Sequence, residues 1–99
     1  MSNGPPFLRK LADNDSEFHA RLCELMAYVN APGKLDVKTK ILVSLALDAA
    51  FGAKDGVRAL SIAARSAGAS EEEIREVLRQ AFMMGGIPAV VASLEAWPE

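Results

Sequence analysis

The sequence predicts an all-α fold, a small domain of five to six helices around a central helical hairpin. Apolar residues recur at the three- and four-residue spacing of amphipathic helices in successive stretches of the chain. Proline and glycine residues, which end helices, separate these stretches. No window alternates apolar and polar residues with β-branched enrichment, so no strand is expected. The 99 residues suffice for one domain.

The first 31 residues predict an N-terminal helical segment. Pro5-Pro6 can open a short helical turn, because proline is tolerated in a first turn. The polar run 13–16 supplies N-caps for a longer helix. Its apolar face is formed by Phe18, Leu22, Leu25, Met26 and Val29. Ala31-Pro32-Gly33 ends this helix, and we expect residues 32–99 to form the main part of one compact domain.

The predicted hairpin runs from Lys38 to Gly68. Between Ile41 and Phe51 the chain is apolar on almost every face of a helix, broken only by Ser44 and Asp48. A helix of this kind is expected to be buried on every face. A second helix follows Gly52, with Asp55 as a plausible N-cap. The junction 52–56 is where such a pair can present a site.

Two further helices are predicted after Gly68. Ser70 and Glu73 match a capping box, in which each side chain bonds the backbone of the other, and the acidic first turn suits the helix dipole. Gly85-Gly86 ends this helix, and Pro88 fits the first turn of the last one.

The composition of the chain argues against several classes of function. Lysine and arginine number 11 against 13 acidic residues, and no basic stripe is present, so we expect no nucleic-acid partner. No apolar run approaches the ~18–20 residues that span a bilayer, and no signal peptide is recognisable, so we expect a cytoplasmic protein without a membrane partner. Hydrophobic residues make up 51% of the chain, more than one small core hides, and we therefore expect self-association.

Three motifs follow one another in the main part of the chain. They are Leu35-Asp36-Val37-Lys38-Thr39-Lys40, Gly68-Ala69-Ser70-Glu71-Glu72-Glu73-Ile74-Arg75-Glu76-Val77 and Gly85-Gly86-Ile87-Pro88-Ala89. In this order and spacing they resemble the carboxymuconolactone decarboxylase family, whose fold is that of alkylhydroperoxidase D. The likeness covers roughly Pro32 to Trp97. It implies an alkylhydroperoxidase D-like helical domain and homo-oligomers, commonly trimers or hexamers.

The resemblance also implies where a reactive site lies in relatives. Thiol peroxidases of the family carry a glutamate, two cysteines and a histidine, which attack the peroxide, resolve the sulfenic acid and move protons. The matching positions here hold Ile41, Ala53, Gly56 and Leu60. We therefore expect no peroxide reduction by the family's mechanism. A mainly apolar pocket around these four residues, or a filled core, is expected instead.

Decarboxylases of the family usually keep the histidine and the acidic residue of that set, and both are absent here. Decarboxylating a lactone acid requires a group that holds the carboxylate and a proton donor. The candidates near the junction are Lys54 or Arg58 for the carboxylate and Asp48 or Asp55 for proton transfer. The alternative is that Lys54, Asp55 and Arg58 form a solvated turn.

The other chemically distinctive residues have structural interpretations. Cys23, the single cysteine, excludes an intrachain disulfide and is typical of a small buried hydrophobe. His19 is expected at the surface, and Met83-Met84 in the core or a subunit interface. No cluster has metal-ligand spacing and no glycine-rich loop follows a strand, so we expect neither a metal nor another cofactor.

The sequence thus supports two hypotheses of different class. The first is a homo-oligomeric binding or assembly module for a small apolar or aromatic ligand. The second is a lyase or decarboxylase acting on a small organic acid or lactone.

Overall fold

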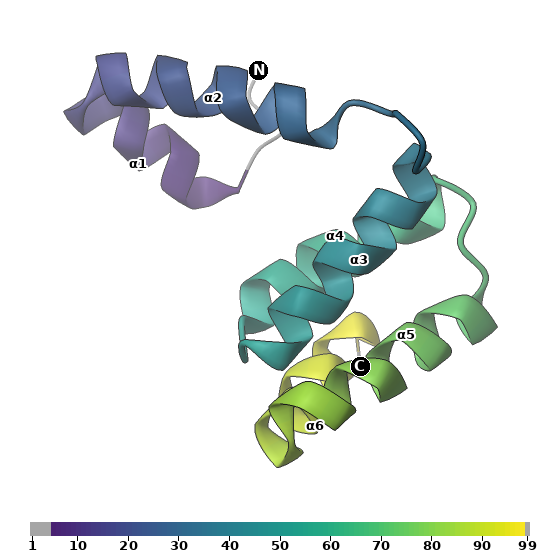
Figure 1. Ribbon diagram of the computed structural model, residues 1–99. Coiled ribbons are helices and arrows are strands. Elements are labelled where there is room, and N and C mark those ends of the chain that lie inside the picture. The colour runs from purple at the N-terminus through teal and green to yellow at the C-terminus, as the bar shows by residue number, and fades with distance from the viewer. Residues whose placement is uncertain (1–4, 99) are drawn as a thin grey trace. The chain divides into compact units, whose positions relative to one another are not determined.

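The computed structural model describes residues 5–98, and Figure 1 shows that they are helical with no strand among them. The chain divides after Ala31 into two compact units. The predicted all-α class is therefore confirmed. Within the described residues, no helix is long and apolar enough to cross a membrane.

The first unit is a pair of helices, α1 (Pro6–Asn14) and α2 (Ser16–Asn30). Proline opens α1 as expected, and the carboxylate of Asp15 caps α2 by accepting the backbone N–H of Phe18 at 3.1 Å. Leu8 is buried in α1, whereas α2 has no buried residue. This unit therefore exposes most of its apolar face, which includes Phe7, Phe18, Leu25, Tyr28 and Val29.

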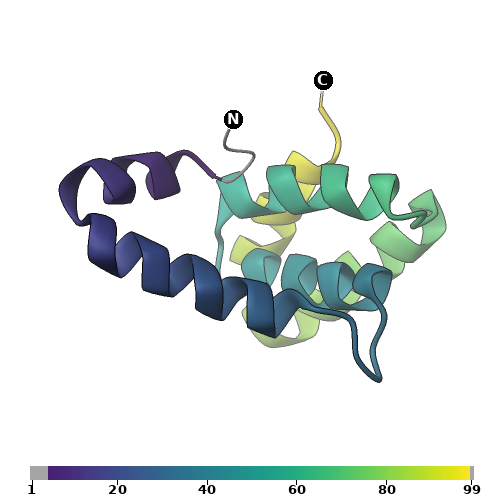
Figure 2. The same ribbon diagram turned by 90° about the horizontal axis from the view of Figure 1, so that it is seen from above.

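The second unit is organised around α3 (Val37–Ala50), which packs against both α4 (Lys54–Ser66) and α5 (Glu71–Gly85). The hairpin of α3 and α4 is visible in Figure 2. Asp36 caps α3 through the N–H of Thr39 at 2.8 Å. The fully or largely buried core is contributed by every helix of the unit: Leu45, Ala49, Val57, Ala64, Ala69, Ile74, Leu78, Ala81, Ala92 and Ala96.

The start of α5 has the predicted capping box. The hydroxyl of Ser70 accepts the N–H of Glu73 at 3.0 Å, and the Glu73 carboxylate accepts the N–H of Ser70 at 2.8 Å. Glu73 also accepts a hydrogen bond from Lys38 of α3 at 3.0 Å. One acidic residue thus fixes the first turn of α5 and links it to α3.

The chain ends in α6 (Ile87–Ser93) and a 3₁₀ turn, η1 (Leu94–Ala96). Gly86 separates α5 from α6 with φ of 70°, a conformation that disfavours other residues. The preceding Gly85 lies where α3, α5 and α6 meet. A Cβ atom built on it would be 2.7 Å from the carbonyl oxygen of Ala50 and 2.8 Å from Cβ of Ala89.

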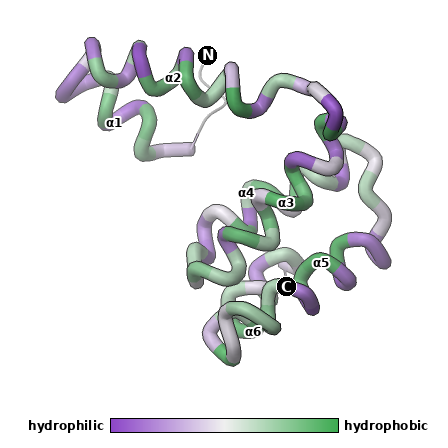
Figure 3. The backbone as a smooth tube through the Cα atoms, viewed as in Figure 1, coloured by the Kyte–Doolittle hydropathy of each residue, from purple (hydrophilic) through white to green (hydrophobic). Residues whose placement is uncertain are grey.

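Two local predictions differ from the structure of the subunit. Within one subunit α3 is not buried on every face, because Val43 and Leu47 are 47% and 51% exposed. A subunit this small has too few helices to surround the central one. Asp55 is not the N-cap of α4 either, since that position belongs to Ala53 and Asp55 lies in the first turn. Figure 3 shows that hydrophobic segments occur along all the helices.

Candidate functional site

The junction between α3 and α4 is a tight turn closed by backbone hydrogen bonds. The N–H of Gly52 donates to the carbonyl of Ala49 at 3.0 Å, and that of Ala53 donates to the carbonyl of Asp48 at 2.8 Å. Gly52 has a φ of 76°, which glycine adopts without a steric penalty. The turn brings the last turn of α3 against the first turn of α4.

The four positions at which the resemblance places the reactive groups of the thiol peroxidases lie on α3, on α4 or between them. Ile41 of α3 and Leu60 of α4 are half-buried and pack against the core. Ala53 is the N-cap residue of α4, and Gly56 lies in its first turn. None of the four lines the apolar groove described below between α5 and the C-terminal segment, so a ligand pocket around them stays a prediction.

Asp48 occupies the space that a side chain at position 56 would need. A Cβ atom built on Gly56 would lie 1.8 Å from Oδ2 of Asp48. A side chain at position 56 would therefore clash with Asp48 in its present orientation. Partial burial, which disfavours the charged form, raises the pKa of the Asp48 carboxyl.

We expect Asp48→Asn to raise the stability of the protein at neutral pH. Because the folded-state pKa of Asp48 is raised, its contribution to stability is present below the unfolded pKa of about 3.8 and is lost as pH rises through the folded pKa. The amide keeps the shape and removes the buried charge. Thermal unfolding should show a small increase in Tm at pH 7 that vanishes near pH 3. An increase of the same size at both pH values would contradict this explanation.

The other predicted catalytic candidates form an exposed ion-pair group. Arg58 donates to Asp55 at 3.0 Å and is also paired with Glu95 of η1. The Asp55 side chain is 97% exposed, and Lys54 is exposed as well. In the described part of the chain, no ion pair joins Lys54 or Asp48 to this group. The structure thus brings together Asp55 and Arg58 but not the full set of four.

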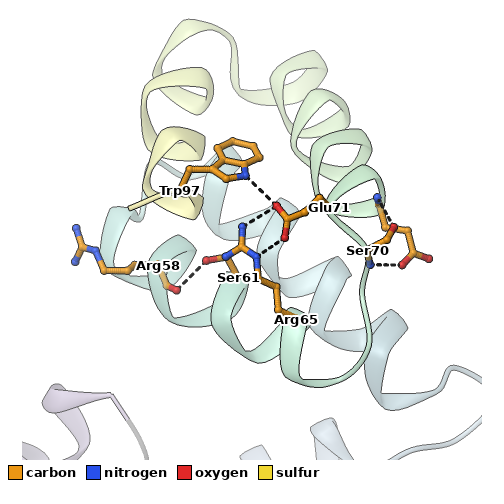
Figure 4. Close-up of polar contacts among 7 residues, drawn as sticks. Arg58, Ser61, Arg65, Ser70, Glu71 and Trp97 are labelled. Carbon is orange, nitrogen blue, oxygen red and sulfur yellow. Dashed lines mark hydrogen bonds and ion pairs between the residues drawn. The ribbon is translucent and has the colours of Figure 1, made fainter. Parts of the chain in front are cut away.

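A second polar cluster links α4, α5 and the end of the chain (Figure 4). The guanidinium of Arg65 donates two hydrogen bonds to Glu71, at 2.6 and 3.1 Å, and the indole N–H of Trp97 donates to the same carboxylate at 3.1 Å. The bonds from Arg65, followed by the bond from Trp97, lower the pKa of Glu71 to about 2. We interpret this cluster as a clamp that holds the C-terminal turn on α4 and α5.

This clamp should weaken in acid. The folded-state pKa of Glu71 lies below its unfolded value of 4.5, so its contribution to stability is present above pH 4.5 and is lost as pH falls toward 2. The gap in urea midpoint between the wild type and Glu71→Gln should therefore be widest at pH 6 and narrow toward pH 2. Glu76→Gln, an exposed substitution on the same helix, is the control and should show a much smaller gap. A Glu71→Gln gap that did not change with pH would contradict the prediction.

An apolar groove lies between α5 and the segment formed by α6 and η1. Its accessible volume is about 370 Å³, within the range of small-molecule sites. Its lining is almost entirely apolar and is formed by Leu78, Phe82, Val90, Leu94 and Trp97 together with Arg75, Arg79 and Ser93. The groove residues on α5 recur at the three- and four-residue spacing of one helix face, and so do those of the C-terminal segment. The groove itself was not predicted from the sequence, although this spacing indicates one face on each of the two helices.

The remaining singled-out residues lie elsewhere. Cys23 is a free, half-buried thiol whose Sγ lies 3.4 Å from Nε2 of His19, one turn earlier on α2. Met83 and Met84 are 70% and 84% exposed, so they are not in the core of the subunit. Among the described residues, no three histidine, cysteine or acidic side chains are grouped as metal ligands would be.

Comparison with known proteins agrees with the helical architecture. The family model described as "Carboxymuconolactone decarboxylase family" matches residues 16–99. Uncharacterized protein MJ1511 of Methanocaldococcus jannaschii is 31% identical over 83 residues, covering 84% of this chain and 78% of that protein. The crystal structure of apo-lpg0406, a carboxymuconolactone decarboxylase family protein from Legionella pneumophila, superposes with a TM-score of 0.82 at 30% identity, covering 90% of this chain and 80% of that one.

The protein is thus a small all-helical domain of the alkylhydroperoxidase D-like type. It belongs to the carboxymuconolactone decarboxylase family. The resemblance predicted from the three sequence motifs is confirmed.

Proposed function

We propose that this protein is a homo-oligomeric, non-redox member of its family that binds a small apolar or aromatic ligand. The observation that carries the non-redox part of the proposal is that the family's reactive positions are filled by apolar residues or blocked. Ile41 and Leu60 pack against the core, and the space above Gly56 is taken by Asp48. The family's thiol-peroxidase mechanism uses a nucleophilic and a resolving cysteine, and this chain contains one cysteine only.

Self-assembly is supported by the amount of apolar surface on one subunit. Large apolar side chains that are 46% exposed or more are frequent in the second unit: Leu35, Val43, Leu47, Phe51, Ile62, Met83, Met84, Ile87, Val91 and Leu94. Extensive exposed apolar surface is typical of protein–protein interaction sites. We propose a trimer or hexamer.

Peroxide turnover tests the non-redox part of the proposal. With hydrogen peroxide or cumene hydroperoxide and dithiothreitol as reductant, we expect the wild type and Cys23→Ala to consume peroxide at the same background rate. A rate that is well above background in the wild type and lost in Cys23→Ala would overturn the proposal. That outcome would assign a function to the contact between Cys23 and His19.

A lyase is the second candidate, and the raised pKa of Asp48 is the observation that favours it. A carboxyl with a raised pKa at a helix junction can donate a proton to a developing carbanion. If the protein decarboxylates a lactone acid and Asp48→Asn abolishes turnover while leaving the fold intact, this function replaces the binding module. Turnover that survives in the variant would exclude Asp48 as the acid.

A further inference from the structure

Exposed apolar side chains gather at the end of the second unit where α3 and α5 both finish. A Cβ atom built on Gly85 would touch both Ala50 and Ala89, so the ends of α3 and α5 and the start of α6 meet there. Figure 1 shows the three helices converging at this end of the unit. We call the exposed surface there the end patch; it is formed by Phe51, Met83, Met84 and Ile87, which are 68% to 84% exposed. Exposed apolar surface of this kind is typical of interaction sites.

The end patch carries no charge of its own. The segment 81–94 contains no acidic or basic residue, and neither does the segment 49–53. The C-terminal ends of α3 and α5 are the negative ends of their helix dipoles, and neither helix has a lysine or arginine in its last turn. Anionic lipids and nucleic acids bind where such basic residues cluster. The charge distribution therefore argues against both of them as the partner.

A second copy of the chain fits this charge distribution. In a twofold contact the same patch lies on both copies, so residues near the axis meet their own kind. A charged residue there would face a like charge, which is unfavourable, whereas apolar side chains pack on one another without this cost. Methionine side chains also adapt to irregular facing surfaces. A partner of different sequence is commonly selected by complementary charges, and the end patch offers none.

We propose that two copies of the chain bind each other through their end patches, about a twofold axis. This inference rests on the proposed self-assembly and names one of its interfaces. A twofold contact pairs the copies, so the assembly contains an even number of them. Of the two proposed assemblies, the inference selects the hexamer, in which end patches join two trimers.

Opposite charges at Met84 test this contact. Met84 is 84% exposed in the subunit, so Met84→Glu and Met84→Lys should both fold and keep the helical circular dichroism of the wild type. Native mass spectrometry should find half the wild-type number of copies in each variant alone, because like charges face each other across the axis. An equimolar mixture, with one variant labelled with ¹⁵N, should regain the wild-type number and contain both variants equally.

Ser66→Glu is the matched control. Ser66 is exposed and lies at the end of α4 that is remote from the α3–α4 junction. This change introduces the same charge away from the end patch and should leave the number of copies unchanged. Flotation of the wild type with vesicles of phosphatidylcholine and phosphatidylserine tests a membrane as the partner, and we expect no binding.

Three outcomes would overturn the inference. They are a number of copies that Met84→Glu does not change, a mixture of the two charged variants that does not reassemble, and vesicle binding that Met84→Glu abolishes. A wild-type trimer would overturn this inference and leave the proposed self-assembly intact, whereas a wild-type monomer would overturn both. Peroxide turnover that depends on Cys23 would overturn the non-redox function without affecting the end patch, so the failures are distinguishable.

Discussion

Leu45→Ala should reduce the free energy of unfolding by about 4 kcal/mol. Leu45 lies in the middle of α3 and is completely buried against residues of the other helices of the second unit. Truncation removes the transfer free energy of the lost atoms and leaves a cavity that the tightly packed alanines around it fill poorly. For a chain of this length the loss is a large share of total stability. Urea unfolding followed by circular dichroism measures it.

Leu47→Ala is the matched control on the same helix. Leu47 is 51% exposed in the subunit, so the same change in chemistry should have a far smaller effect on the unfolding of one subunit. A shift in oligomer size without unfolding is compatible with the proposed assembly. Equal losses of stability for the two variants would contradict the packing described for α3.

Gly85→Ala should destabilise the protein by about 2 kcal/mol, even though alanine is the better helix former. The added methyl group would lie 2.7 Å from the backbone oxygen of Ala50 and 2.8 Å from Cβ of Ala89. The carbonyl oxygen of Ala50 belongs to the backbone and cannot rotate away. The end of α3 and the start of α6 would therefore have to move away from α5. Thermal unfolding should show a clear fall in Tm.

Gly33→Ala is the control for this substitution. A Cβ atom at Gly33 meets nothing within 4 Å, so the change should alter stability by no more than about 0.5 kcal/mol. A Gly85→Ala variant as stable as Gly33→Ala would show that the three helices do not approach as closely as described.

Local sequence signals predicted the helices well. The capping box of Ser70 and Glu73 and the breaks at Gly52 and Gly86 each act within a few residues. Such signals are readable without the fold, because a helix end must satisfy its own backbone groups. Asp55 was placed two positions too late, because the N-cap of α4 is Ala53, whose side chain makes no capping hydrogen bond and so gives no sequence signal.

The sites depended on contacts that the sequence does not display. Trp97 and Glu71 are 26 residues apart, and the groove combines two segments that are separated by the glycine pair. The proximity of Asp48 to Gly56 depends on the geometry of one turn. Periodicity identifies the face of each helix but not the helix it meets.

The pairing of Cys23 with His19 was missed for a different reason. The two residues are four positions apart on one helix, a spacing that places side chains side by side. We interpreted each residue separately, although the spacing was visible in the sequence.

Native mass spectrometry of the freshly purified protein tests the central proposal most directly. It reports the size of the assembly and any retained small molecule in one measurement. We predict a trimer or hexamer that carries a discrete extra mass, consistent with a small apolar or aromatic molecule and lost under harsher activation. A bare monomer would contradict both the assembly and the ligand-binding function.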